Sequence, residues 1–262
     1  MRKQKQKTKN IIRTLRSVYR LLCRVVYPEC CPICDEVPPQ QLTGDGVARI
    51  CPTCRPKVTP VQTPFCMKCG KPLIEYAERV EYCADCKRIA HEYTQGRAVY
   101  VYRGAIIGTM HRLKYNHRQD YAVALARDAY ERLGSWIERI APQVIVPIPL
   151  HKKRKKTRGY NQAQLLAAEL SRLTGIPMDA DLLQRTMDTR PQRELSASER
   201  KNNLKKAFQM SKKSVQLEKV LLIDDIYTTG STVDAAARVL KSGGVRQVYV
   251  LCVCIGGDKG EE

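Results

Sequence analysis

The sequence predicts an α/β domain with a mainly parallel sheet, preceded by a small cysteine-rich segment and a basic amphipathic helix. From about residue 96 onward, apolar runs alternate with helical patterns, which is typical of parallel strands joined by helices. Residues 30–90 instead carry nine of the twelve cysteines and eight of the fourteen prolines, so this segment needs metal ions to hold it together. We therefore divide the chain into a helix at 1–28, a double zinc ribbon at 29–90 and the α/β domain at 91–262.

The charge of the chain favours anionic partners. Its 262 residues include 46 Lys and Arg against 26 Asp and Glu, which leaves a net charge of +20. Such an excess favours nucleic acid, phosphorylated small molecules or an anionic membrane surface as partners. A hydrophobic content of 43% argues against a mostly disordered chain. The charge alone does not choose between the three kinds of partner.

The first 28 residues predict a helix with one apolar and one basic face, because nine Lys and Arg alternate with apolar residues and no acid is present. Arg residues interrupt the apolar ones, unlike a signal peptide or a membrane span, so we expect a cytoplasmic protein. The helix either docks on its own protein or attaches peripherally to anionic lipid or nucleic acid. The apolar stripe comprises Ile11, Leu15, Val18, Leu22 and Val25, and the basic side comprises Arg13, Arg16, Arg20 and Arg24.

Four Cys-x-x-Cys units follow one another in the cysteine-rich segment. Two residues between thiolates let one tight turn direct both sulfurs at a single ion, so eight ligands form two closed zinc sites. Sequential pairing of the units is the simplest arrangement, and an interleaved one also fits the spacing. Closed four-thiolate sites are structural, so zinc removal is expected to unfold residues 30–90 and leave the α/β domain folded. The ligands are Cys31, Cys34, Cys51, Cys54, Cys66, Cys69, Cys83 and Cys86.

The α/β domain is expected to contain four strands and at least three helices. Apolar runs rich in Val and Ile predict strands at 98–102, 143–147, 220–223 and 248–254. Apolar residues at helical spacing predict helices at 121–137, 162–173 and 232–242. The basic stretch 151–158 lies between a strand and a helix and is expected to be a loop.

The strand at 220–223 leads directly into two acids and a polar turn. Asp224 and Asp225 come first, and residues 228–232, called the phosphate turn below, hold four hydroxyls and Gly230 before the next helix. Backbone N–H groups, hydroxyls and a helix N-terminus at the end of a parallel strand form a cradle for an anion. Two acids beside a phosphate suit the vicinal hydroxyls of a ribose with a magnesium ion nearby. A simple capped polar turn explains the acids and hydroxyls less well.

Residues 220–232 resemble the phosphoribosyl-pyrophosphate (PRPP) signature of type I phosphoribosyltransferases. The resemblance implies that Asp224 and Asp225 hold the ribose hydroxyls of PRPP, which binds with Mg²⁺. Purine-salvage members carry Asp at the fifth motif position, where this chain has Thr228, and this argues against purine salvage. The residues implied to hold the 5′-phosphate are Thr228, Thr229, Gly230, Ser231 and Thr232.

Further segments resemble the ComF family of competence-associated proteins, which combine a zinc-binding cysteine module with such a domain. The segments are His111-Arg-Leu-Lys114-Tyr115, Val146-Pro-Ile-Pro-Leu150, Arg158-Gly-Tyr-Asn-Gln-Ala163, Thr189-Arg-Pro-Gln192, and Leu195 through Glu199 and Asn203 to Phe208. The resemblance covers the chain from about residue 25. It implies a type I phosphoribosyltransferase fold and a role in natural transformation, with single-stranded DNA and other competence proteins as partners.

Six cations in the eight residues 151–158 repel one another unless they meet anions. If the ComF resemblance holds, this loop lies beside the phosphate turn and holds pyrophosphate or leads a nucleic acid strand past the site. A solvated surface loop is the alternative. Tyr100, Tyr102, Tyr115, Tyr160 and Tyr227 flank these elements and could stack on bases, although packing explains each one more simply. The residues proposed for pyrophosphate or DNA are Lys155, Lys156, Arg158, Asn161, Arg190, Gln192 and Arg200.

Two functions are compatible with this pattern. One is a PRPP-binding protein of the ComF family that handles single-stranded DNA, and this is the interpretation we favour. The other is an active phosphoribosyltransferase acting on an unidentified acceptor. No catalytic residue is assigned, because the sequence offers no general base beyond the two acids.

Overall fold

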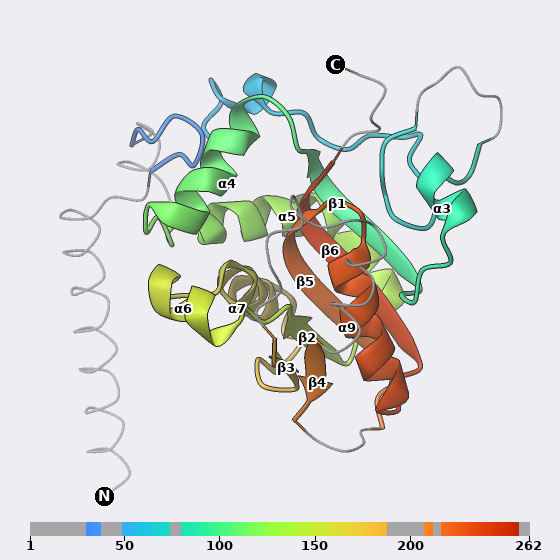
Figure 1. The fold of residues 1–262 in the computed structure, drawn as a ribbon. Helices are drawn as coiled ribbons and strands as arrows, with labels where there is room; N and C mark the ends of the chain where they lie inside the picture. Colours follow the sequence, from blue (N-terminus) through green and yellow to red (C-terminus); the bar gives the residue numbers. More distant parts are fainter. Residues whose placement is uncertain (1–29, 38–48, 74–79, 188–206, 212–215, 257–262) are drawn as a thin grey trace, which may run out of the picture.

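The computed structural model describes residues 30–37, 49–73, 80–187, 207–211 and 216–256 (Figure 1). The predicted N-terminal helix lies outside these residues, as do the candidates Arg190, Gln192 and Arg200. Among the described helices, none is long and apolar enough to cross a membrane.

A four-stranded sheet forms the centre of the molecule, with every pair of neighbouring strands parallel. Its strands are consecutive runs of buried side chains, as expected where both faces are covered. The four predicted strands are all present. In spatial order they are β1 (Gln95–Val101), β6 (Gln247–Ile255), β5 (Lys219–Tyr227) and β2 (Val144–Pro147).

Strand β5 extends four residues beyond the predicted end at residue 223. Asp224 is in register with Cys252 of β6, and Tyr227 is in register with Ile255. The apolar run ends at 223, but β6 continues and offers further backbone partners. The two acids therefore lie within the strand rather than after it, which fixes their backbone.

Two layers of helices cover the sheet. On one face, α5 (Tyr121–Ile140) and α7 (Gln162–Thr174) pack with Leu221 and Ile223. On the other face, α9 (Ser231–Ser242) packs with Val220 and Leu222. These three helices confirm the predictions at 121–137, 162–173 and 232–242.

Three further elements surround the carboxyl ends of the strands. Helix α4 (Ala105–Tyr115) follows β1, and a small antiparallel pair is formed by β3 (Leu183–Arg185) and β4 (Phe208–Met210). The third element corrects the prediction of a loop at 151–158, because these residues form the helix α6 (Lys152–Arg158). His151 accepts a hydrogen bond from the Lys153 N–H at its start, and Gly159 ends it with φ of 80°.

The cysteine-rich segment shares its cores with the α/β domain. Its first part buries Cys31, Ile50 and Cys54 against α4, α5 and the sheet. Its second part, which contains the short helix α3 (Ala84–Arg88) after the 3₁₀ turn at Arg55–Lys57, buries cysteines against β5, β6 and α9. Backbone hydrogen bonds of 2.9 Å also join residues 59–61 to β1. The boundaries at 28/29 and 90/91 stay predictions, and the shared cores lead us to expect that the two parts unfold together rather than separately.

Candidate functional site

The two acids lie at the carboxyl end of β5, next to β2. The Asp225 backbone N–H donates to Asp224 Oδ1 at 2.9 Å, and Lys114 Nζ lies 2.9 Å from Asp225 Oδ2. Burial raises the pKa of Asp224 to about 7, and the charge of Asp225 adds to this rise. Burial opposes the charge of Lys114, but the two acids outweigh it and raise the pKa of that ammonium group. The site therefore contains two acids that share one lysine.

Lys114 is a site residue that the sequence analysis did not assign. It comes from the last turn of α4, more than a hundred residues before β5 in the chain. Only its place in the segment 111–115, which resembles a ComF element, indicated it. Its ammonium group faces the acids because α4 packs over the carboxyl edge of the sheet.

The phosphate turn has the backbone shape of an anion cradle. Gly230 has φ of 78°, and a Cβ there would overlap the Tyr227 hydroxyl and lie 3.1 Å from His91 Cε1. Thr229 Oγ1 and Ser231 Oγ are 2.9 Å apart, and no side chain within the described residues caps the start of α9. The first N–H groups of α9 and the turn are therefore free to bind an anion.

A cavity of about 210 Å³ joins the acids to the turn. Of the predicted PRPP residues, Asp224, Asp225, Thr228 and Thr232 line it. Four cations line it as well. Lys114 and Arg185 were missed because they come from distant segments, whereas Arg154 belongs to the basic stretch 151–158 but was not among the residues proposed for pyrophosphate or DNA. The four are Lys114, Arg154, Arg158 and Arg185.

The predicted cations and amide have unequal roles. Arg158 lines the cavity, whereas Lys155 and Lys156 are exposed on α6 and do not line it. Asn161 lines it, but its Oδ1 accepts from the Ala163 N–H at 3.1 Å and its Nδ2 donates to the Ile148 carbonyl at 2.9 Å. Its side chain therefore caps α7 and holds the loop after β2.

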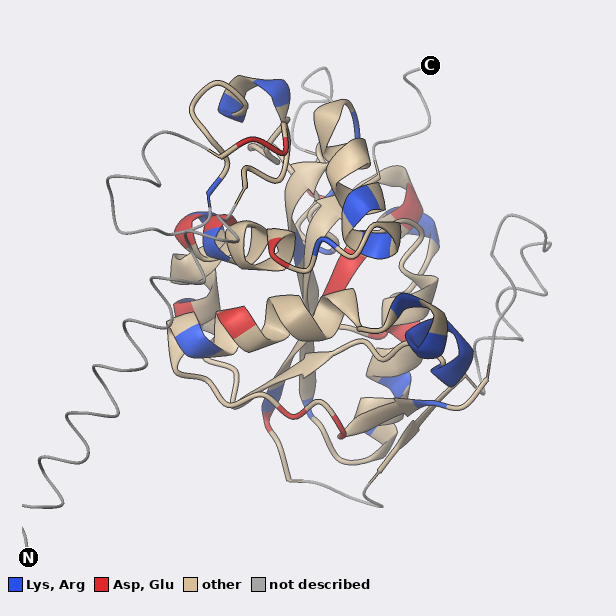
Figure 2. Ribbon diagram, turned by 90° about the vertical axis from the view of Figure 1, so that its left-hand side faces the viewer, with Lys and Arg blue, Asp and Glu red and all other residues tan. Residues whose placement is uncertain are grey.

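A second cavity of about 520 Å³ adjoins the first and shares Lys114, Arg154 and Arg158 with it. Helix α6 forms one wall, and Figure 2 shows this helix as a nearly continuous band of Lys and Arg. No acidic side chain lines this cavity among the residues that the structure describes. The remaining lining residues are Tyr115, His117, Lys153 and Thr157.

Packing in the core explains three of the five tyrosines that flank the site. Tyr100, Tyr160 and Tyr227 are buried, so they cannot stack on a ligand base. Tyr115 is 58% exposed and lines the second cavity, with the Arg158 guanidinium 4.9 Å from its ring centroid. Tyr115 is thus the tyrosine best placed to meet a ligand.

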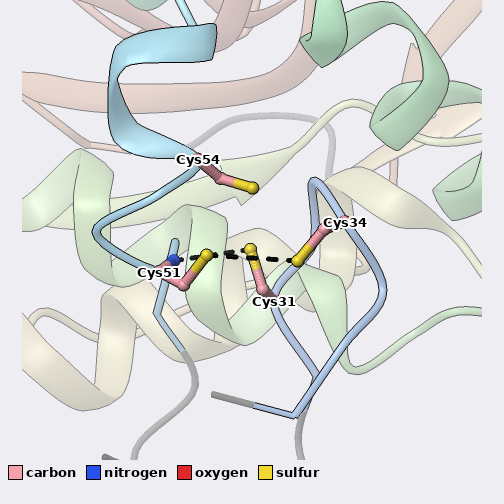
Figure 3. Close-up of side chains that lie close together, drawn as sticks. All are labelled: Cys31, Cys34, Cys51 and Cys54. Atoms are coloured by element: carbon pink, nitrogen blue, oxygen red, sulfur yellow. Dashed lines mark hydrogen bonds between the residues drawn. The ribbon is translucent and has the colours of Figure 1, made fainter. Parts of the chain in front are cut away.

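The cysteines form two clusters with sequential pairing. In each cluster the four Sγ atoms lie within 4.8 Å of one another. Figure 3 shows the first of the two clusters. Two of these separations are 4.0 Å for Cys34–Cys51 and 3.7 Å for Cys69–Cys83, close to the roughly 3.8 Å expected for thiolates about 2.3 Å from a tetrahedral zinc. The first cluster is Cys31, Cys34, Cys51 and Cys54, and the second cluster is Cys66, Cys69, Cys83 and Cys86.

The thiols of the second cluster suit a bound cation. Hydrogen bonds from Cys69 and Cys86 hold the pKa of Cys66 far below its usual range, which favours the thiolate form at this sulfur. Thiolate sulfur is the preferred ligand of structural zinc, and no position in either cluster is left open for a substrate. The two sites fit zinc in a structural role.

Replacing Asp224 by asparagine tests the raised pKa of this acid. An aspartate in the unfolded chain titrates near about 3.9, so the folded chain binds this proton more tightly and loses stability as the pH rises from about 4 to about 7. Relative to D224N, the wild type should lose roughly 1–4 kcal/mol of unfolding free energy over this range. Denaturant unfolding at a series of pH values measures the difference, and parallel curves for the two proteins would contradict the prediction.

Comparisons with known families match both parts of the chain. Residues 22–87 match the double zinc ribbon domain family, and residues 91–262 match the phosphoribosyl transferase domain family. The phosphoribosyl transferase match covers the whole sheet and both cavities. It establishes the fold as a type I phosphoribosyltransferase fold preceded by a double zinc ribbon.

Three curated proteins are similar over most of their length. Competence protein F of Haemophilus influenzae is 32% identical over 77% of this chain and 88% of its own. DNA utilization protein YhgH of Escherichia coli is 32% identical over 78% of this chain and 89% of its own. Competence protein ComFC of Bacillus subtilis is 30% identical over 82% of this chain and 89% of its own.

Proposed function

The chain belongs to the ComF family of competence proteins, and from that premise we propose that it binds PRPP with Mg²⁺ in the smaller cavity and single-stranded DNA along α6. The observation that carries the proposal is the smaller cavity itself. It brings two acids, the phosphate turn and four cations together at the end of one strand.

Each part of PRPP has a matching group in this cavity. The carboxylates of Asp224 and Asp225 can accept hydrogen bonds from the two ribose hydroxyls. The phosphate turn offers N–H groups and hydroxyls to the 5′-phosphate, and Arg154 and Arg158 face the space left for the pyrophosphate. Mg²⁺, which prefers oxygen ligands, would enter on the phosphates facing the acids and neutralise part of their charge. Lys114 lowers the repulsion between the acids and an incoming anion.

Single-stranded DNA fits the second cavity and the exposed side of α6. DNA binding requires a row of cations that can follow phosphates, and α6 supplies Lys153, Lys155 and Lys156 on its exposed side. Tyr115 adds a ring at the cavity wall. The names of the relatives, which include a DNA utilization protein, support this part of the proposal. Contact of residues 1–28 with membrane or nucleic acid, and contact with other competence proteins, stay predictions.

An active phosphoribosyltransferase is the second candidate. One observation favours it, namely the pKa of about 7 for Asp224, because a general base works best when its pKa lies near the ambient pH. Release of pyrophosphate from PRPP in the presence of candidate acceptors would distinguish transfer from binding alone.

Replacing both acids by asparagine tests PRPP binding. The double variant D224N/D225N should lose at least about 100-fold in affinity for PRPP with Mg²⁺, since two charge-assisted hydrogen bonds disappear. Isothermal titration measures the affinity. E218Q is the matched control, because Glu218 lies just before β5 at the opposite end of the strand and pairs with Arg246 on the surface. Wild-type affinity in the double variant would disprove the proposal.

Replacing cations on α6 tests the two ligands separately. K155A/K156A should weaken binding of a single-stranded oligonucleotide and lower the slope of log K against log salt by roughly 0.7 per lost contact, while PRPP affinity stays unchanged. R154A/R158A should weaken the binding of both PRPP and the oligonucleotide, because these residues line both cavities. Fluorescence anisotropy of a labelled oligonucleotide across a salt series measures the DNA binding. If the wild type does not bind DNA at low salt, the DNA part of the proposal is wrong.

A further inference from the structure

A buried histidine connects the double zinc ribbon to the helix that follows the phosphate turn. His91 lies between α3 and β1, and its side chain is 1% exposed. Its Nδ1 is 2.7 Å from Oδ2 of Asp234 in the first turn of α9, and Oδ1 of Asp234 accepts from the Glu92 N–H at 2.9 Å. Because a carboxylate accepts hydrogen bonds, Nδ1 carries a proton in this contact. The residues at 91 and 92 thus hold both oxygens of Asp234.

The same segment also contacts the turn and the residue before it. His91 Cε1 lies 3.1 Å from the position of a Cβ on Gly230, so the ring packs directly against the turn. Tyr93 stacks on His91 at 5.0 Å, and its hydroxyl is 2.8 Å from the hydroxyl of Tyr227, the last residue of β5. Residues 91–93 therefore contact Tyr227 just before the phosphate turn, Gly230 within it and Asp234 just after it.

This segment is held in turn by the second cluster. Lys68, which lies between Cys66 and Cys69, donates from Nζ to the Tyr93 carbonyl at 2.5 Å and lies 5.3 Å from the centroid of the Tyr93 ring. The Lys68 carbonyl accepts from the Gly96 N–H at 2.7 Å. The loop between Cys66 and Cys69 and the phosphate turn therefore both contact this one short segment.

His91 keeps this position at a cost. Its Nε2 is buried and has no hydrogen-bond partner among the described residues, and burying a polar atom without a partner is unfavourable. An apolar ring would avoid this cost but would not hold Asp234.

We propose that His91 is a positioning residue that fixes the phosphate turn in its anion-binding shape, so that the second cluster supports ligand affinity from outside the α/β domain. The inference rests on the proposed function for the identity of the anion.

Two substitutions of His91 and one of its neighbour Glu92 test this role. H91A removes the contact to Asp234, whereas H91N keeps an amide N–H near the place of Nδ1. E92Q is the matched control, because the Glu92 side chain pairs with Arg238 of the same helix, one turn further along, at 3.0 Å. H91A should lower the affinity for PRPP with Mg²⁺ by about tenfold, and H91N should restore most of it, while E92Q should change it by less than about twofold.

Hydrogen–deuterium exchange in the unliganded chain supplies a readout that does not depend on any ligand. The amides of residues 228–232 should exchange faster in H91A than in the wild type and E92Q, with the central strands unchanged. Unchanged exchange of these amides, or wild-type PRPP affinity in a folded H91A protein, would overturn the inference. If the wild type does not bind PRPP, the proposed function fails, and the exchange experiment alone decides whether His91 positions the turn. Should H91A not fold, H91F takes its place with the same expected results, because an apolar ring fills the same space but does not hold Asp234.

Discussion

Replacing Cys69 by serine is expected to unfold the α/β domain together with the double zinc ribbon, in one transition. Cys66, Cys69 and Cys83 are buried in the same core as α9 and one face of the sheet. Gly70 packs so closely that a Cβ there would be 3.0 Å from the Arg97 Cα in β1. Loss of the second zinc would therefore expose β1, the edge strand of the sheet.

The expected size of this effect is comparable to the whole stability of an ordinary domain. Structural zinc contributes about 10–16 kcal/mol in zinc-finger peptides, against about 5–15 kcal/mol for the unfolding of a whole domain. Circular dichroism during heating, together with the zinc content, measures the outcome. C30S is the matched control, because Cys30 adjoins a ligand but belongs to neither cluster. Two separate transitions, with the α/β domain melting at its usual temperature, would restore the expectation drawn from the sequence.

Replacing Gly230 by alanine should strongly weaken PRPP binding and leave the chain folded. The residue has φ of 78°, and the added Cβ would overlap the Tyr227 hydroxyl and lie 2.9 Å from its Cζ. Backbone strain of this kind costs about 1–3 kcal/mol, and the turn must also move away from Tyr227, which displaces the N–H groups that face the phosphate. We expect a loss of affinity of about 100-fold or more.

The control for this variant separates strain from displacement. Gly175 has φ of 75° and ends α7, and nothing lies within 4 Å of a Cβ placed there. G175A should therefore lose stability without losing PRPP affinity. Isothermal titration and thermal unfolding of both variants measure the two effects. Equal PRPP affinity in G230A and G175A would show that the shape of the phosphate turn does not matter for binding.

The strands and most helices could be predicted from the sequence because their patterns are local. An apolar run such as 220–223 identifies a buried strand, but its extension to Tyr227 depends on pairing with β6, which only the folded chain provides. Helix α6 was missed because six like charges suggested a loop. Lys and Arg nevertheless have high helix propensity, and the caps at His151 and Gly159 are signals that the sequence contained.

The candidate site could be predicted where its residues are consecutive. Asp224, Asp225 and the phosphate turn belong to one motif, whereas Lys114 and Arg185 reach the same cavity from α4 and β3. No spacing rule connects these segments, so their meeting depends on the order of the strands. Asn161 lines the cavity as well, but it also has a structural role that the motif did not indicate, since a polar residue directly before a helix can serve as its N-cap.

Under the proposed function, the three cations shared by the two cavities would make PRPP and DNA antagonists. Lys114, Arg154 and Arg158 can neutralise only a limited negative charge, so an anion in one cavity weakens the attraction for an anion in the other. Thermodynamic linkage requires this coupling to be reciprocal. Bound DNA would lower the affinity for PRPP by the same factor by which bound PRPP lowers the affinity for DNA. The affinity of the protein for DNA would then fall as the supply of PRPP rises, which would let the concentration of this sugar phosphate set when a strand is released.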